Sequence, residues 1–137
     1  MYMENTRIQR TLYFCRKINK MGDPELKTKW DKLVVFVSKE FGDGEELDLQ
    51  AILFLIGIQE LGQGYREFKK REKTDLMHIS ICRLLSRYGY YKYEGVDKDG
   101  WPHWSTNEKL PPLKPGEQTI LMKEAAVLYF EESGVEL

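Results

Sequence analysis

The chain has 137 residues, of which 42% are hydrophobic and 31% charged, and its formal net charge is −1. This composition excludes an intrinsically disordered chain, and the length predicts a single domain over residues 1–137. Within it we expect an N-terminal basic helix or arm at 1–22 and a helical core at 23–137 that carries a hairpin.

Three features predict a cytoplasmic protein with no membrane partner. The longest uninterrupted apolar run, Ala51 to Ile58, is too short for a bilayer, which takes about 20 residues to cross. The first twenty residues lack the continuous apolar core of a signal peptide. Cys15 and Cys82 are far apart and in no CxxC pattern, which is typical of reduced thiols in a reducing compartment.

The charge is distributed in four alternating blocks. Residues 1–20 and 66–92 are basic, with net charges of +4 and +5, whereas residues 21–65 and 93–137 each carry −5. The blocks either neutralise one another across the fold or leave the basic ones to converge on a polyanion. The first alternative is favoured, because a dedicated nucleic-acid domain usually has a clear positive excess.

Two helices are predicted in the first third of the chain. Over residues 4–20 the apolar side chains of Ile8, Leu12 and Cys15 recur at helical spacing, with basic residues between them. The second helix, 24–41, has Asp23 as its N-cap and a proline at its first position. Its apolar stripe predicts one buried face.

The middle of the chain predicts three further helical segments. Residues 49–61 are apolar on nearly every side, so we expect this helix at the centre of the domain. Gly57 costs it about 1 kcal/mol relative to alanine, which the close approach of a neighbouring helix would explain. Residues 65–73 predict a short basic helix, and Thr74-Asp75 is expected to cap another at 76–88.

Residues 90–105 predict an antiparallel β-hairpin that turns at Asp97–Gly100. Two registers are open. If Val96 pairs with Trp101, then Tyr93 faces Trp104; if the loop closes with a glycine bulge, Asp97 pairs with Trp101 and the partners shift by one. A slip of one residue changes which aromatic side chains are buried. Most of them are expected to seal the core.

Three prolines predict an extended crossing at 106–116, and residues 117–132 predict a last helix that ends at Gly134. The expected fold is therefore mainly α, or α+β in the loose sense. It is a compact helical domain of about five helices with one antiparallel β-hairpin, an arrangement that resembles a winged helix.

No catalytic motif is present, so we expect no enzyme and no cofactor. Asp97 and Asp99 resemble part of a calcium loop, but Gly95 and Thr106 stand where two acidic ligands belong, so no metal is expected. His78 and Cys82 are four residues apart on a helix and within reach of each other. Such a pair is usually structural.

The function we favour is a small non-enzymatic intracellular protein-interaction module, whose partner is a second copy or another protein. Aromatic residues and histidine on the hairpin are the chemistry of interface hot spots. The candidate binding residues are Trp101, His103, Trp104 and Tyr93.

The alternative is a nucleic-acid-binding protein, because the order of helix 49–61, basic segment 65–73, helix 76–88 and hairpin resembles a winged helix-turn-helix. This resemblance implies that the helix before the hairpin enters the major groove. The residues facing the groove would be Ser80, Arg83 and Arg87. Those contacting phosphates would be Lys69, Lys70, Arg71, Lys73 and Lys92.

Overall fold

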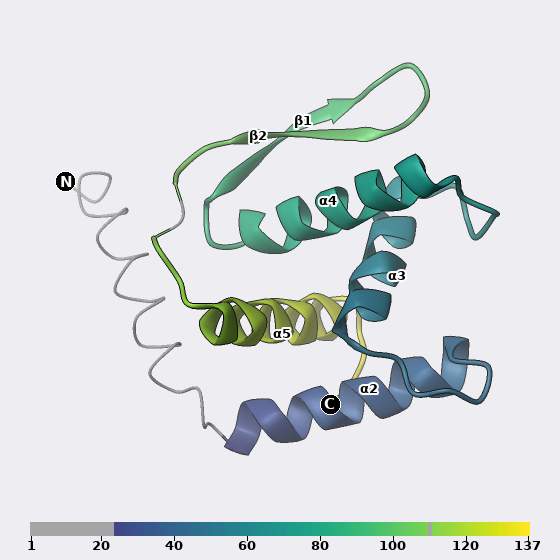
Figure 1. Ribbon diagram of the computed structural model, residues 1–137, viewed down its shortest axis with the longest axis vertical. Helices are drawn as coiled ribbons and strands as arrows, with labels where there is room; N and C mark the ends of the chain where they lie inside the picture. The colour runs from purple at the N-terminus through teal and green to yellow at the C-terminus, as the bar shows by residue number, and fades with distance from the viewer. Residues whose placement is uncertain (1–23, 110) are drawn as a thin grey trace.

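Residues 24–109 and 111–137 are described by the computed structural model and hold four helices and one β-hairpin (Figure 1). In chain order these are α2 (Pro24–Phe41), α3 (Leu49–Leu61), α4 (Lys70–Ser86), β1 (Tyr91–Val96), β2 (Pro102–Thr106) and α5 (Pro115–Glu132). The predicted mainly helical fold with one hairpin is confirmed. The count of about five helices is not, and the helix predicted at 4–20 lies outside the described residues.

The elements are stacked around α4. The hairpin lies over one side of α4, α5 lies along the opposite side, and α2 packs on the far side of α5 (Figure 1). Helix α3 crosses α4 and makes its most extensive contacts there. Residues 49–61 were expected to form the centre of the domain. The structure shows α4 in this central role, because it contacts α3, α5 and both strands.

The apolar side chains form two clusters. The larger one joins all four described helices, through fully buried residues such as Leu33, Ile52 and Leu84, with Ala125 from α5. The smaller cluster lies between α3 and the start of α4, and the half-buried Trp101 of the hairpin packs against it. None of the helices in the described ranges is long and apolar enough to cross a bilayer.

Helix α4 begins at Lys70, six residues earlier than predicted, and the short helix expected at 65–73 is absent. The Glu72 carboxylate accepts the backbone N–H of Lys69 (2.9 Å) and pairs with the Arg66 guanidinium (2.9 Å). These contacts satisfy an otherwise orphan N–H at the helix start. Thr74 lies inside the helix, where its hydroxyl donates to the carbonyl of Lys70.

Gly57 marks the crossing of α3 and α4. A Cβ atom at this position would lie 2.4 Å from the carbonyl oxygen of Leu76, well inside van der Waals contact. The expected close approach of a neighbouring helix is confirmed. Glycine is kept in the middle of α3 because the backbone of α4 occupies the space that a side chain would need.

The hairpin combines the two registers that the sequence left open. Next to the turn it closes with a glycine bulge: the N–H of Asp97 donates to Trp101, and Gly100 has a φ of +85°. A second irregularity at Glu94 then moves the pairing by one residue, so Tyr93 faces Trp104. Such bulges insert one extra residue on one strand and leave the pairs beyond them in a new register.

Candidate functional site

The basic residues at the start of α4 are all exposed. We call the group formed by Lys69, Lys70, Arg71 and Lys73 the basic face. None of the four forms an ion pair with a residue in the described ranges. Only Arg66 among the neighbouring cations is neutralised, by Glu72. The basic face therefore presents four exposed positive charges within little more than one turn of helix, of which Lys69 is near enough to Glu72 to help lower the pKa of that carboxyl.

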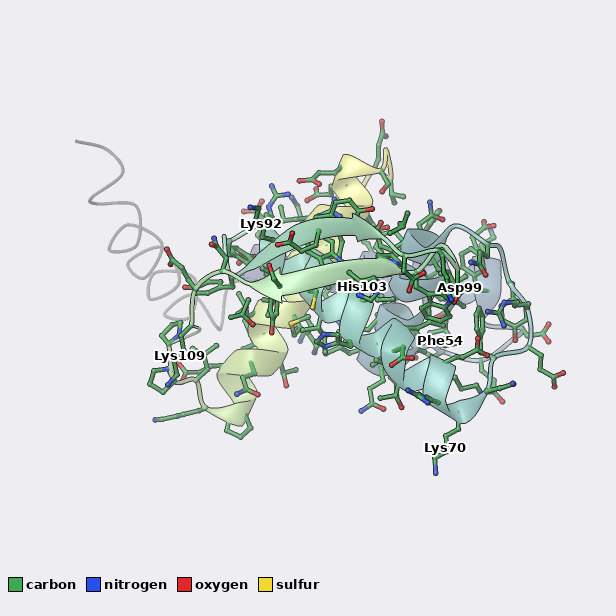
Figure 2. The ribbon with its side chains drawn as sticks, turned by 90° about the horizontal axis from the view of Figure 1, so that it is seen from above. Phe54, Lys70, Lys92, Asp99, His103 and Lys109 are labelled. Carbon is green, nitrogen blue, oxygen red and sulfur yellow. The ribbon has the colours of Figure 1, made fainter. Side chains whose placement is uncertain are left out.

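The first turns of α4 lie to one side of the hairpin, and Lys70 points away from the body of the molecule (Figure 2). Beyond the basic face the N-terminal half of α4 exposes Thr74, Asp75 and His78, while Leu76 is fully buried. Sequence reasoning started the helix at Leu76 and treated Thr74 as a cap, and it considered His78 only as the partner of Cys82.

The residues predicted to face a DNA groove lie elsewhere on α4. Ser80 is fully buried. The Arg83 guanidinium is 3.3 Å from Glu60 of α3 and 5.3 Å from the centre of the Tyr129 ring. Arg87 pairs with Glu132, which also lies 3.9 Å from Arg83. The two arginines thus connect α4 to α3 and α5.

The last residue predicted to contact phosphates, Lys92, lies on the hairpin and away from the basic face. Lys92 is exposed near one end of the hairpin, far from Lys70 at the other end of the molecule (Figure 2). The turn lies beside the α3–α4 connection, where the Gln63 side-chain amide donates to the carbonyl of Asp99 (3.0 Å). The hairpin turn is therefore held in place, and Lys92 does not extend the basic face.

The aromatic residues of the hairpin differ in exposure. Tyr93 is 51% exposed and its ring lies 5.2 Å from that of Trp104. Trp104 is half-buried, and its indole N–H has no acceptor among the described residues. Trp101 packs against the smaller core cluster. Of the four hairpin candidates, Tyr93 and His103 therefore offer the most accessible surface.

His103 contacts Asp97 at 2.9 Å, and the other Asp97 oxygen accepts the backbone N–H groups of Asp99 and Trp101. The bond to His103 is the main cause that lowers the pKa of the Asp97 carboxyl, and the backbone N–H groups add to it. This carboxylate organises the turn. No group of three or more metal-ligating side chains occurs within the described residues.

Cys82 and His78 are in contact, with 3.5 Å between the sulfur and Nε2. Burial raises the pKa of the Cys82 thiol to about 11. The thiol therefore stays protonated at neutral pH and lacks the thiolate that nucleophilic chemistry needs. This geometry agrees with a structural pair.

Comparison with protein-family models, curated proteins and solved structures finds no match to this chain. Two exposed surfaces remain as candidates on the described part of the chain. One is the basic face of α4. The other is the hairpin surface, which we define as Tyr93 and Val96, both exposed and on the face of the hairpin that carries Trp104. His103 is exposed on the opposite face.

Proposed function

We propose that the protein binds double-stranded DNA through the N-terminal half of α4, in the manner of a winged helix. The observation that carries the proposal is the basic face: four exposed cations without ion-pair partners in the described residues, on a helix whose first turns lie to one side of the hairpin. Unpaired lysine and arginine side chains that contact phosphates release counterions, which is the main source of non-specific affinity for DNA.

The arrangement of elements supports this function. A helix, a turn, a second helix and a hairpin follow one another, and α3 crosses α4 closely at Gly57. In the proposed complex Arg83 and Arg87 hold α4 against α3 and α5 and do not touch DNA. The hairpin turn, with Asp97 and Asp99, is held against the α3–α4 connection by Gln63 and makes no phosphate contact in this proposal.

Binding to a random-sequence DNA duplex as a function of salt concentration tests the proposal. The wild type should bind near 50 mM salt and weaken linearly on a double-logarithmic plot, with a slope of about −3 for phosphate contacts by the three lysines of the basic face. The double variant Lys70→Ala/Lys73→Ala should bind more weakly, and its slope should be shallower by about 2.

A matched control removes the same charge from another surface. Lys27 and Lys32 are exposed on α2, which α5 separates from α4 (Figure 1). The variant Lys27→Ala/Lys32→Ala should keep the wild-type slope. Equal losses in the two double variants would show a general charge effect, and absence of binding by the wild type at 50 mM salt would rule the function out.

A second candidate function is association with protein through the hairpin surface, either with another copy or with a different chain. It is favoured by the exposure of Tyr93 and Val96, 51% and 61%, beside the half-buried Trp104. Exposed aromatic residues next to a partly covered tryptophan are typical of interface hot spots.

Sedimentation velocity over a range of concentrations tests the self-associating form of this candidate. Wild-type protein should form a dimer that the variant Tyr93→Ala loses while its melting temperature stays unchanged. Thr28→Ala, an exposed change on α2, serves as the control. A wild type that stays monomeric throughout would exclude self-association by the hairpin surface.

A further inference from the structure

We infer that α4 reads DNA sequence in the major groove through Arg71, Thr74 and His78, an inference that rests on the proposed DNA binding. These three residues are exposed and occur at spacings of three and four, so they form one stripe along the helix. We call them the reading stripe.

The reading stripe occupies the middle of the exposed part of α4. Lys70 and Lys73 lie on one side of it and Asp75 on the other, whereas Leu76 and Ile79 face the core. When a helix enters the major groove, the middle of its exposed face meets the base edges and its flanks meet the backbone. Lys70 and Lys73 are therefore the phosphate contacts on one flank, and the stripe is left for the bases. Asp75 repels phosphates, so the helix must lie closer to the strand that the lysines contact.

The chemistry of the stripe suits base edges. Arginine donates two parallel hydrogen bonds to guanine, and a threonine hydroxyl bonds to several bases while its methyl group contacts thymine. Nε2 of His78 contacts Cys82, so Nδ1 is the ring nitrogen left to donate to or accept from a base. From Arg71 to His78 the helix rises about 10 Å. This length corresponds to about three base pairs at 3.4 Å per step.

The geometry selects DNA over duplex RNA as the ligand. The major groove of B-form DNA admits a helix, whereas that of duplex RNA is too deep and narrow for side chains to read. The expected ligand is therefore a B-form DNA duplex with a short preferred sequence that includes a guanine opposite Arg71.

In vitro selection from a random DNA duplex library tests the inference, with affinities measured afterwards for the selected and the random duplex. The wild type should enrich a motif of about three or more base pairs and prefer it to random DNA by at least tenfold. Arg71→Lys keeps the charge but cannot form the paired bonds to guanine. It should lose affinity for the selected duplex by about tenfold more than for the random one.

Arg87→Lys, the same change at the other end of α4, is the control and should retain the motif. His78→Gln and Thr74→Ala should each change the motif at one position. If the wild type binds random DNA but enriches no motif, or if all stripe variants select the wild-type motif, the reading stripe is refuted while the proposed function stands. Equal competition by duplex RNA would also refute it. Absence of any DNA binding removes both proposals.

Discussion

Glu72 contributes to the start of α4 at Lys70. Its carboxylate contacts both the Lys69 N–H and the Arg66 guanidinium, and the bond to Arg66 is the main cause that lowers its pKa. Moving the helix start to Lys70 brings the basic residues into regular helical geometry. The exposure of Arg71 and Thr74 on the helix thus depends in part on this acidic residue.

The variant Glu72→Gln should lower the melting temperature at pH 7, because it loses the ion pair with Arg66. A carboxyl group whose pKa is lowered by folding contributes stability above its unfolded pKa of about 4.3, and the contribution disappears as the pH falls through the folded value. The difference in melting temperature between wild type and variant should therefore narrow below about pH 4. A difference of the same size at pH 7 and pH 3 would contradict this role.

Sequence reasoning placed the start of α4 incorrectly for an identifiable reason. Thr74 and Asp75 are better N-cap residues than Lys69, so local preference favours a later start. The deciding contacts come from outside the local pattern: Phe68 is buried in the smaller cluster and the Arg66 guanidinium lies 4.4 Å from its ring. Tertiary packing of the preceding segment overrides the stronger cap.

The crossing of α3 and α4 is the contact between elements on which the candidate site depends most. Gly57 brings the backbone of α3 against Leu76, one turn after the basic face. The sequence predicted this close approach correctly, because a glycine inside an apolar helix is unfavourable unless space is restricted.

Gly57→Ala should destabilise the protein by about 1–3 kcal/mol, since the added carbon overlaps the Leu76 carbonyl. Helix propensity alone predicts the opposite, a gain of about 1 kcal/mol. Urea denaturation measures the difference, with Gln59→Ala at an exposed position of the same helix as the control. A variant as stable as the wild type would mean that the two helices separate at little cost.

The register of the hairpin could be predicted from the sequence only in part. The turn residues Asp97 to Gly100 account for the turn and for the glycine bulge at Gly100. The sequence predicted the turn, and the glycine bulge belonged to one of the two predicted registers. The second bulge at Glu94 was not foreseen. The Glu94 carboxylate accepts a hydrogen bond from the Ser105 hydroxyl at 2.6 Å. The alternation of polar and apolar residues along a strand cannot indicate such a contact between strands.

Over the whole molecule, the basic block at 66–92 divides into two parts. Arg83 and Arg87 pair with Glu60 and Glu132, which belong to the two acidic blocks. The basic face stays unpaired by described residues at the other end of α4. Mutual neutralisation, the first of the two alternatives in the sequence, thus applies to Arg83 and Arg87 in the C-terminal half of the helix. Attraction of the N-terminal half to a polyanion stays a prediction. Net charge could not separate the two alternatives, because the division depends on which side chains α3 and α5 cover.

The most direct test of the DNA-binding proposal is to map backbone amide chemical shifts by NMR while a short DNA duplex is added at low salt. The account predicts that the largest changes fall on residues 69–78, with smaller ones at the hairpin turn and none along α2. Changes centred on residues 91–96 and 102–106, or spread evenly over the surface, would contradict it.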